Sequence, residues 1–230
     1  GLEHPDLPPE RLVSNAAGGL LPADDPPAAR AFMEALLDSA AGFDFIKVDF
    51  MSFAIAWLAG ARNWRDALHE PDRQPGANPY RHARRMNRAL EDSLAGRSMD
   101  LMNCNGQAAY NLFNHDVSNS SRCSADYARG DAEKARQHLF QSYANIPWLG
   151  QVAWGDHDMF HCGDPAAGRM MAVSKALSGG PIYLSDPPAD FARDAVMPLC
   201  YEDGRLLRPQ APAAPLPESL FLEYATAGVR

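Results

Sequence analysis

The sequence predicts an α/β fold in which parallel strands alternate with helices. The first observation is that short β-favouring runs are separated by segments with apolar residues at helical spacing, which gives about five strands. Because such alternation joins each strand to the next through a helix, the strands are expected to run parallel with right-handed crossovers. The second observation is that the charged and polar clusters fall where the predicted strands end. Parallel α/β folds place their working residues at those carboxyl ends.

Helix starts and ends carry the clearest local signals. Asp25–Pro26, Asn78–Pro79 and Asp164–Pro165 each place a capping side chain before a proline, which suits the first turn of a helix. Gly42 and the pair Gly179–Gly180 are expected to end the first and last of these helices. The elements expected in chain order are an irregular segment over 1–25, a helix from Pro26 to Gly42, a strand over 43–49, a helix from Pro79 through Leu94, strands over 98–104 and 120–127, a helix over 131–145, a strand and its loop over 149–158, a helix from Pro165 to Gly179 and a strand over 181–186.

The stretch GFDFIKVDF ends in two charges of opposite sign. Side chains alternate along a strand, so Lys47 and Asp49 are expected to face one side. The apolar side chains of the other side are Ile46, Val48 and Phe50. Because a buried charge is costly unless it is paired, Lys47 is expected to keep Asp49 ionised, as a nucleophilic carboxylate requires. The alternative is that Asp49 caps the following helix, a position where Asp is common.

The segment RCSAD holds a second candidate carboxylate. Arg122 and Asp126 stand four residues apart at the end of a short strand. Two carboxylates on separate strand ends, facing one cavity, are the minimum for glycoside hydrolysis, with one ionised and the other protonated. Asp126 is the candidate for the protonated group. The alternative is that Arg122 and Asp126 form an ordinary salt bridge within a loop.

The segment GDHDMFHC raises the alternative of a metal site. Asp156, His157, Asp158 and His161 are all residue types that bind metals, and the two histidines have HxxxH spacing. The HExxH form with its general base is absent, and the two apolar residues between the histidines indicate packing beneath the strand ends. Neither GxSxG nor GxGxxG occurs in the chain. We therefore expect no metal and no other cofactor.

Composition and charge argue against several classes of partner. The net charge of -8 and the pI of about 5.3 argue against nucleic acid and against an anionic membrane. No apolar run approaches the roughly 20 residues that a membrane span needs. The four cysteines are widely spaced, without CxxC or zinc-ribbon spacing, and are expected to be reduced thiols of a cytoplasmic protein.

Several strings occur together in an order that resembles glycoside hydrolase family 36. They are GFDFIKVDF, LMNC, RCSADY, WGDHDMFHC, GGPIYLSDPP and DGRLLRP, spread over about residues 18–210. The chain is most similar to the raffinose synthase and seed imbibition protein branch of that family. In this branch the corresponding motifs read VKVD, R-x-S-D-D-F, DWDMF, GGPIYVSD and DGSILR.

The resemblance implies a (β/α)8 barrel that acts on α-galactoside oligosaccharides with retention of configuration. The nucleophile of the family falls on Asp49, and its acid/base falls on Asp126. The positions that the resemblance assigns to substrate binding are Lys47, Cys104, Arg122, Asp156 and Asp158.

The chain departs from the family pattern in its motifs and in its length. Ala125 stands where the family has a second Asp, and His157 replaces the tryptophan of DWDMF. A complete barrel needs eight strands and usually about 250 residues, whereas this chain carries about strands 4–8. Residues 1–208 are therefore expected to form a partial barrel, with 209–230 a Pro/Ala-rich tail that leads toward a C-terminal domain.

Several functions are compatible with these residues. The leading hypothesis is a retaining, α-galactosidase-like glycoside hydrolase that uses Asp49 and Asp126. A galactosyltransferase of the raffinose synthase type is the first alternative, because hydrolysis and transfer share a covalent intermediate. An inactive, truncated barrel is the second, since the chain is expected to carry only about strands 4–8 of the eight. The third is a metal-dependent hydrolase that uses Asp156, His157 and His161.

Overall fold

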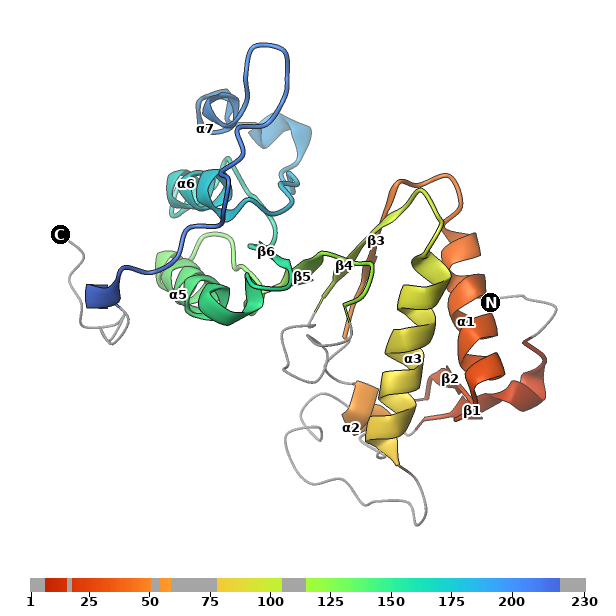
Figure 1. Ribbon diagram of the computed structural model, residues 1–230. Coiled ribbons are helices and arrows are strands. Elements are labelled where there is room, and N and C mark those ends of the chain that lie inside the picture. The colour runs from red at the N-terminus through yellow and green to blue at the C-terminus, as the bar shows by residue number, and fades with distance from the viewer. Residues whose placement is uncertain (1–6, 16–17, 51–53, 59–77, 105–114, 220–230) are drawn as a thin grey trace. The chain divides into compact units, whose positions relative to one another are not determined.

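The computed structural model describes residues 7–15, 18–50, 54–58, 78–104 and 115–219 (Figure 1). The chain divides into two compact units, residues 1–119 and 120–230, and each has its own helices and a pair of parallel strands. In unit 1, β3 (Phe45–Val48) pairs with β4 (Asp100–Asn103). In unit 2, β5 (Ser120–Arg122) pairs with β6 (Trp154–Asp156). The predicted α/β class with parallel strands is confirmed.

Two helices cover the strand pair of unit 1. Helix α1 (Pro26–Ser39) and helix α3 (Pro79–Leu94) lie side by side in Figure 1 and contact each other along the core. The Asp25 carboxylate accepts the Ala28 N–H at 2.9 Å, as the predicted N-cap requires. Asn78 likewise accepts the Arg81 N–H at 3.0 Å, so both predicted helix starts are confirmed. The core between helices and strands is built mainly from Leu37, Leu90, Leu94 and Leu101.

The two faces of β3 differ largely as the alternation predicts. Ile46 and Val48 are half-buried and pack against the helical core. Lys47 and the following Asp49 are exposed. Phe50 departs from the prediction: its φ of 58° ends the extended backbone, and its ring lies 5.5 Å from that of Trp57 in the short helix α2 (Ala54–Leu58). The alternation therefore stops one residue earlier than expected.

The predicted irregular segment 1–25 contains a small antiparallel pair, and this part of the prediction is wrong. A 3-10 turn, η1 (Pro9–Arg11), leads into β1 (Leu12–Ser14), which pairs with β2 (Leu20–Pro22). The connection closes because Asn15 accepts the Gly19 N–H at 2.8 Å through its side chain. Gly18 takes a φ of 83°, which glycine adopts at little cost.

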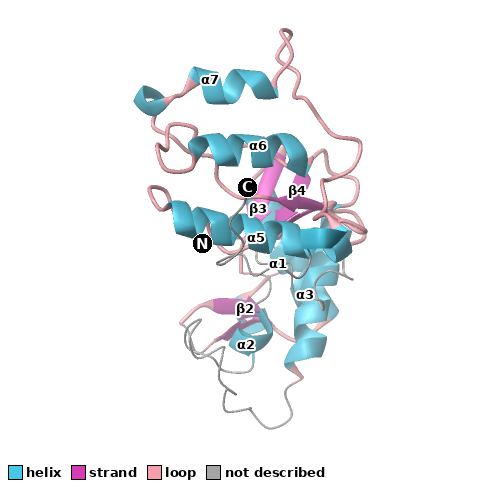
Figure 2. Cartoon of the chain, turned by 90° about the vertical axis from the view of Figure 1, so that its left-hand side faces the viewer, coloured by secondary structure: helices cyan, strands magenta, loops and turns pink. Residues whose placement is uncertain are grey.

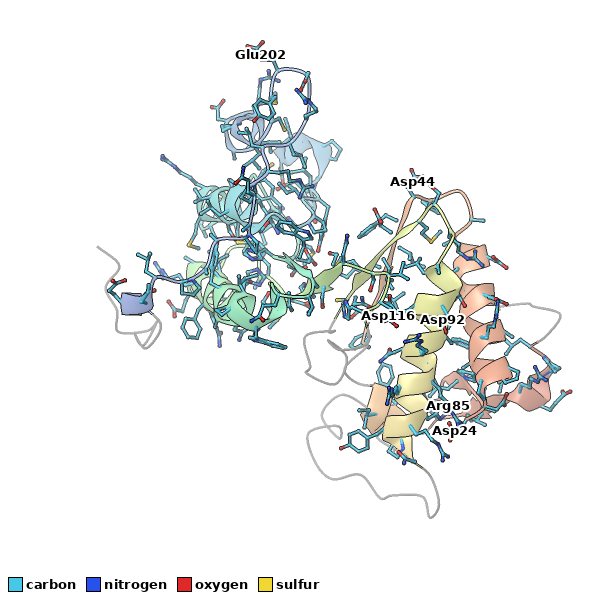
Figure 3. All side chains as sticks on the ribbon, viewed as in Figure 1. Asp24, Asp44, Arg85, Asp92, Asp116 and Glu202 are labelled. Carbon is cyan, nitrogen blue, oxygen red and sulfur yellow. The ribbon has the colours of Figure 1, made fainter. Side chains whose placement is uncertain are left out.

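An ion pair ties this segment to α3. The carboxylate of Asp24 lies 2.8 Å from the Arg85 guanidinium, and Figure 3 shows the two side chains meeting beside α3. Arg81 reaches the same carboxylate at 2.7 Å. The contact lies just before the cap of α1, so it fixes the entry of the chain into that helix.

A buried glutamate of α3 holds the segment over 116–118, which precedes β5. Glu91, only 3% exposed, accepts the N–H groups of Asp116, Val117 and Ser118 at 3.2, 2.7 and 2.8 Å. The Ser118 hydroxyl also donates to Glu91. Charge-assisted hydrogen bonds of this kind are about twice as strong as neutral ones. Glu91 thereby fixes the approach of the chain to its next strand.

Glu91→Gln should destabilise the protein by about 1–3 kcal/mol, because the neutral amide replaces a carboxylate that accepts several buried donors. Urea unfolding of the purified variant measures the change. The matched control is Asp92→Asn on the neighbouring position of α3, where the side chain is 59% exposed and pairs with Arg88. The control should stay within about 0.5 kcal/mol of the wild type. An equal effect of both substitutions would contradict the role of Glu91.

Helix α5 (Ala132–Leu149) of unit 2 is longer than the predicted helix over 131–145. Asp131 caps it by accepting the Lys134 N–H at 3.0 Å. The helix continues through Pro147, which lacks an N–H and so leaves one helical hydrogen bond unmade. Burial of Ile146 and Leu149 compensates for that loss, since both side chains belong to the unit's interior.

Helix α6 (Gly168–Ser178) begins later than predicted and ends as predicted. Asp164 does not cap it; its Oδ1 accepts the Ala166 N–H at 2.8 Å and closes a separate turn before the helix. Gly179 ends the helix with a φ of 68°. Part of the predicted tail lies against this helix, since the Ala213 N–H donates to the Leu177 carbonyl at 3.0 Å.

The predicted strand over 181–186 is wrong. The structure retains one parallel bridge, Phe160 with Leu184, made by hydrogen bonds of 3.2 and 3.0 Å. Pro181 begins the segment and Pro187 follows it, and neither can donate to a ladder, which prevents the bridge from extending. The chain continues through η4 (Pro188–Asp190), α7 (Arg193–Val196), η5 (Met197–Leu199) and η6 (Pro217–Ser219). Helix α7 lies against α6 (Figure 2).

The interior of unit 2 is formed around Phe160, Met171 and Leu199. All four cysteines of the chain are free thiols; Cys104, Cys123 and Cys162 are buried, whereas Cys200 is half-buried. Within the described part of the chain, no helix is both long enough and apolar enough to cross a membrane.

Candidate functional site

Arg122, at the carboxyl end of β5, is the centre of a carboxylate cluster in unit 2. Its guanidinium lies 2.8 Å from Asp126 Oδ1, 2.7 Å from Asp158 Oδ1 and 3.5 Å from Asp156 Oδ2. The Arg122 side chain is 3% exposed and those of Asp156 and Asp158 are 0% exposed, whereas that of Asp126 is 82% exposed. The structure therefore brings four of the predicted site residues together, with only Asp126 open to solvent.

The register of the parallel strands explains why these residues meet. Arg122 lies directly opposite Asp156, and both end their strands at the same edge. Two residues later, Asp158 has a φ of 62°, a left-handed conformation that Asp tolerates better than most residues. Its N–H donates to Asp156 Oδ1 at 2.9 Å, and its own Oδ2 accepts the Tyr127 N–H at 2.6 Å. The turn thus holds the Asp158 carboxylate between Arg122 and the loop that carries Asp126.

Two members of the cluster, Tyr183 and Lys175, were not predicted from the sequence. The Tyr183 hydroxyl donates to Asp156 Oδ2 at 3.1 Å and to Asp158 Oδ1 at 3.3 Å. Lys175 of α6, 1% exposed, donates from Nζ to the carbonyl oxygens of His157, at 2.5 Å, and Asp158. Tyr183 stands within the motif GGPIYLSD. The signal for Lys175 is a single cation in the otherwise uncharged run MMAVSKALSGG.

Burial dominates the electrostatics of the cluster. It raises the pKa of Asp156, against the lowering effect of Lys175 and Arg122. It lowers the pKa of Lys175 to about 8, against the raising effect of Asp156 and Asp158. The pKa of Tyr183 is raised by burial and by the same two carboxylates, so the phenol stays a neutral donor. Two cations and two carboxylates compensate each other in the interior, which a buried charge cluster requires.

The histidines of the segment contact other side chains of unit 2. His157 Nδ1 lies 2.7 Å from the Ser174 hydroxyl, and burial lowers the pKa of His157 to about 3. The His161 ring stacks on Tyr127 at 5.8 Å, while Asp156 is directed at Arg122. Among the described residues, no three His, Cys, Asp or Glu side chains are grouped so that they could hold a metal. These contacts give no support to the alternative of a metal-dependent hydrolase built on Asp156, His157 and His161.

Asp186 holds the backbone at Cys162 and Gly163 in place. Its Oδ2 accepts the Cys162 N–H at 2.6 Å, and its Oδ1 accepts the Gly163 N–H at 3.2 Å. Burial acts to raise the pKa of Asp186, but the hydrogen bonds from Cys162 and Gly163 outweigh it and the pKa is lowered. A carboxylate held in this way favours the folded state while it is ionised.

The stability that Asp186 contributes should be present above about pH 4 and should be lost as the pH falls through its lowered folded-state value. The free-energy difference between the wild type and Asp186→Asn should accordingly shrink on acidification. Urea unfolding between pH 3 and pH 7, about the range that brackets a carboxyl pKa, measures it. Asp203→Asn is the control, because that side chain is 53% exposed and bonded only locally. A difference that does not vary with pH would contradict this role.

The remaining predicted site residues lie in unit 1, at the carboxyl edge of β3 and β4. Asp49 follows β3, and its Oδ1 accepts the Phe50 N–H at 2.6 Å. Cys104 follows β4, donates its N–H to the Val48 carbonyl at 2.8 Å and is 2% exposed. Lys47 and Asp49 are exposed beside it. The ion pair between Lys47 and Asp49, and the catalytic and binding roles of these residues, stay predictions.

Comparison with known proteins identifies relatives. The family described as raffinose synthase or seed imbibition protein Sip1 matches residues 80–229. A protein of Arabidopsis thaliana named probable galactinol–sucrose galactosyltransferase 6 is 31% identical over 195 residues, which are 82% of this chain and 23% of that protein. The galactinol–sucrose galactosyltransferase of Oryza sativa subsp. japonica is 35% identical over 86 residues, 37% of this chain and 11% of that protein. The stachyose synthase of Pisum sativum is 35% identical over 80 residues, 35% of this chain and 9% of that protein.

The match of the family covers well over half of the chain, and it includes the whole Arg122 cluster. The chain spans less than a quarter of the length of these curated relatives. On this evidence the chain belongs to the raffinose synthase and seed imbibition protein family.

Proposed function

We propose that the protein transfers a galactosyl unit from an α-galactoside donor to a sugar acceptor. The observation that carries the proposal is the Arg122 cluster, in which an exposed carboxylate and its arginine stand at the carboxyl ends of parallel strands in a chain of this family. The strands would belong to a (β/α)8 barrel, as about strands 4–8. Barrel enzymes place their active sites at that edge.

The reaction would proceed through a covalent galactosyl–enzyme intermediate. Asp49 attacks the anomeric carbon while Asp126 protonates the departing oxygen. Asp126 then takes the proton from the acceptor hydroxyl as the acceptor oxygen attacks the same carbon and the bond from that carbon to Asp49 breaks, so two inversions give overall retention. This requires the two carboxyl groups to lie about 5–5.5 Å apart across the bound sugar. The exposed fraction of Asp126 supports its part, since it leaves the carboxyl accessible to a substrate.

The other site residues divide by their burial. Lys47 is exposed and Arg122 contacts Asp126, so both are proposed to contact the galactose unit. Cys104 is buried, but it follows β4 beside the end of β3, and we propose that it also contacts the galactose unit. The side chains of Asp156 and Asp158 are 0% exposed and hold Arg122. Their predicted contact with substrate would therefore be made through the arginine.

Transfer is favoured over the hydrolysis that we expected from the sequence. The relatives are named galactosyltransferases and a stachyose synthase, none of them a hydrolase. The names of the two galactosyltransferases indicate galactinol as the donor and sucrose as the acceptor. Water and a sugar hydroxyl compete for the same intermediate, so the outcome depends on the acceptor side of the site.

The test measures both outcomes in one protein. The purified protein is incubated with galactinol and sucrose, the products are separated by chromatography, and NMR assigns the configuration of the new linkage. We expect an α-linked trisaccharide to form faster than free galactose. A parallel incubation with a nitrophenyl α-galactoside and no acceptor reports hydrolysis. Release of galactose without transfer would contradict the proposal and favour an α-galactosidase. The absence of both products would favour an inactive barrel portion.

A further inference from the structure

Lys175 is a buried cation in contact with two consecutive peptide groups. Its ammonium group donates to the carbonyl oxygens of His157 and Asp158, at the turn that follows β6. The same group lies 5.8 Å from the centre of the Tyr183 ring. A lysine with 1% exposure gives up most of its hydration, so its contacts have to replace that solvation. The contacts are made to the backbone of the turn and not to a carboxylate.

The turn that Lys175 holds determines where the Asp158 carboxylate lies. Residue 158 is left-handed, with a φ of 62°, and backbone of this kind persists only where surrounding contacts over-determine it. Through this turn Asp158 reaches the Arg122 guanidinium at 2.7 Å. Arg122 in turn holds Asp126 Oδ1 through two hydrogen bonds, at 3.1 and 2.8 Å. An unbroken series of contacts therefore leads from α6 to the exposed carboxyl group.

The charges of the cluster call for a second cation. The single positive charge of Arg122 faces three carboxylates, those of Asp126, Asp156 and Asp158. Two of these are fully buried, and without Lys175 the buried part of the cluster would carry two negative charges and one positive charge. The raised pKa of Asp156 shows that its ionised form is already disfavoured by burial. With Lys175 in place, the buried charges sum to zero, and Arg122 can also bind the carboxylate of Asp126.

We propose that Lys175 is a positioning residue for the reaction: it clamps the left-handed turn at residue 158 and balances the buried carboxylates, so that Arg122 holds Asp126 in its reactive orientation. The inference rests on the proposed function for the role of Asp126. Lys175 itself touches neither the substrate nor the reacting atoms.

Three variants test this role. Lys175→Met removes the charge and the donors, and Lys134→Met is its matched control on α5, where the side chain is 67% exposed. The double variant Lys175→Met with Asp156→Asn removes one buried charge of each sign. We expect Lys175→Met to lower kcat for transfer at least about tenfold and to raise KM for the donor by a clearly smaller factor, because the orientation of Asp126 is lost while most contacts with the sugar remain. The control should keep both constants.

Unfolding and structure provide readouts that do not depend on activity. The double variant should unfold at a higher temperature than Lys175→Met, because its buried charges are balanced again. A crystal structure of Lys175→Met should show residue 158 outside the left-handed region and Arg122 withdrawn from Asp126. If the wild type proves inactive in transfer, the proposed function fails while these two readouts still test the clamp.

Several results would overturn the inference. One is a Lys175→Met variant with the wild-type kcat. Another is a double variant that is less stable than Lys175→Met alone, because the balance of buried charges would then not contribute to stability. If neither variant folds, Lys175 is a folding residue and the positioning role falls. Retention of the Arg122–Asp126 contact in the variant structure would likewise exclude it.

Discussion

Arg122→Met should destabilise the protein by about 3–5 kcal/mol, the cost of removing one partner from a buried ion pair. Asp156 and Asp158 would remain at 0% exposure with Lys175 as the nearby cation. Methionine keeps much of the arginine's apolar length, so the loss comes from charge and hydrogen bonds and not from a cavity. Chemical unfolding followed by far-ultraviolet circular dichroism measures the change.

The control for Arg122→Met is Arg136→Met on α5. Arg136 is 56% exposed and pairs with Glu133 three residues earlier, a surface contact worth about 0–1 kcal/mol. The two variants thus remove the same group from a buried and from an exposed ion pair. A loss of less than about 1 kcal/mol for Arg122→Met would mean that the buried carboxylates are not held in their ionised form.

Asp49→Asn should reduce galactosyl transfer by at least about a thousandfold, because an amide cannot form the covalent intermediate. The fold should be unaffected, since residue 49 is exposed and asparagine can accept the same Phe50 N–H. Transfer assays with galactinol and sucrose measure the loss. Mass spectrometry of acid-quenched protein should find a galactosyl adduct on the peptide that contains Asp49, and no adduct in the variant.

Asp44→Asn is the control for the nucleophile. Asp44 is exposed and immediately precedes β3 at its opposite end, as Figure 3 shows by its place above the strand. This substitution should leave the transfer rate unchanged. Normal turnover by Asp49→Asn, or an adduct on a different peptide, would refute the assignment of Asp49.

The parts of the fold that sequence predicted well depend on neighbouring residues. Caps such as Asp25 and Asn78 act within a single helical turn, so local chemistry suffices to place them. The strand over 181–186 was mispredicted because pairing needs a partner from elsewhere in the chain, and among the described residues only Phe160 supplies one. The antiparallel pair near the N-terminus was missed because a segment rich in Pro, Gly and Ala is normally irregular. Here the side chain of Asn15 accepts a hydrogen bond from Gly19 and brings the two strands together.

The candidate site divides in the same way. Arg122, Asp156 and Asp158 were found because their residue types and strand-end positions are visible in the sequence. Lys175 and Tyr183 approach from the following helix and from the segment beyond it. Their contribution depends on tertiary packing, and a lone lysine in a helix is normally exposed. The sequence therefore indicated the residues at the strand ends but not the residues of α6 and the following segment that hold them in place.

The burial of the cysteines has a practical consequence for labelling. Cys104, Cys123 and Cys162 are buried, and burial raises the pKa of the Cys123 thiol to about 12, so little reactive thiolate forms there. Cys200, beside η5, is the most accessible of the four. A maleimide dye added to the native protein should therefore attach at one position. That single attachment point would allow fluorescence to follow α7 and its surroundings without any engineered cysteine.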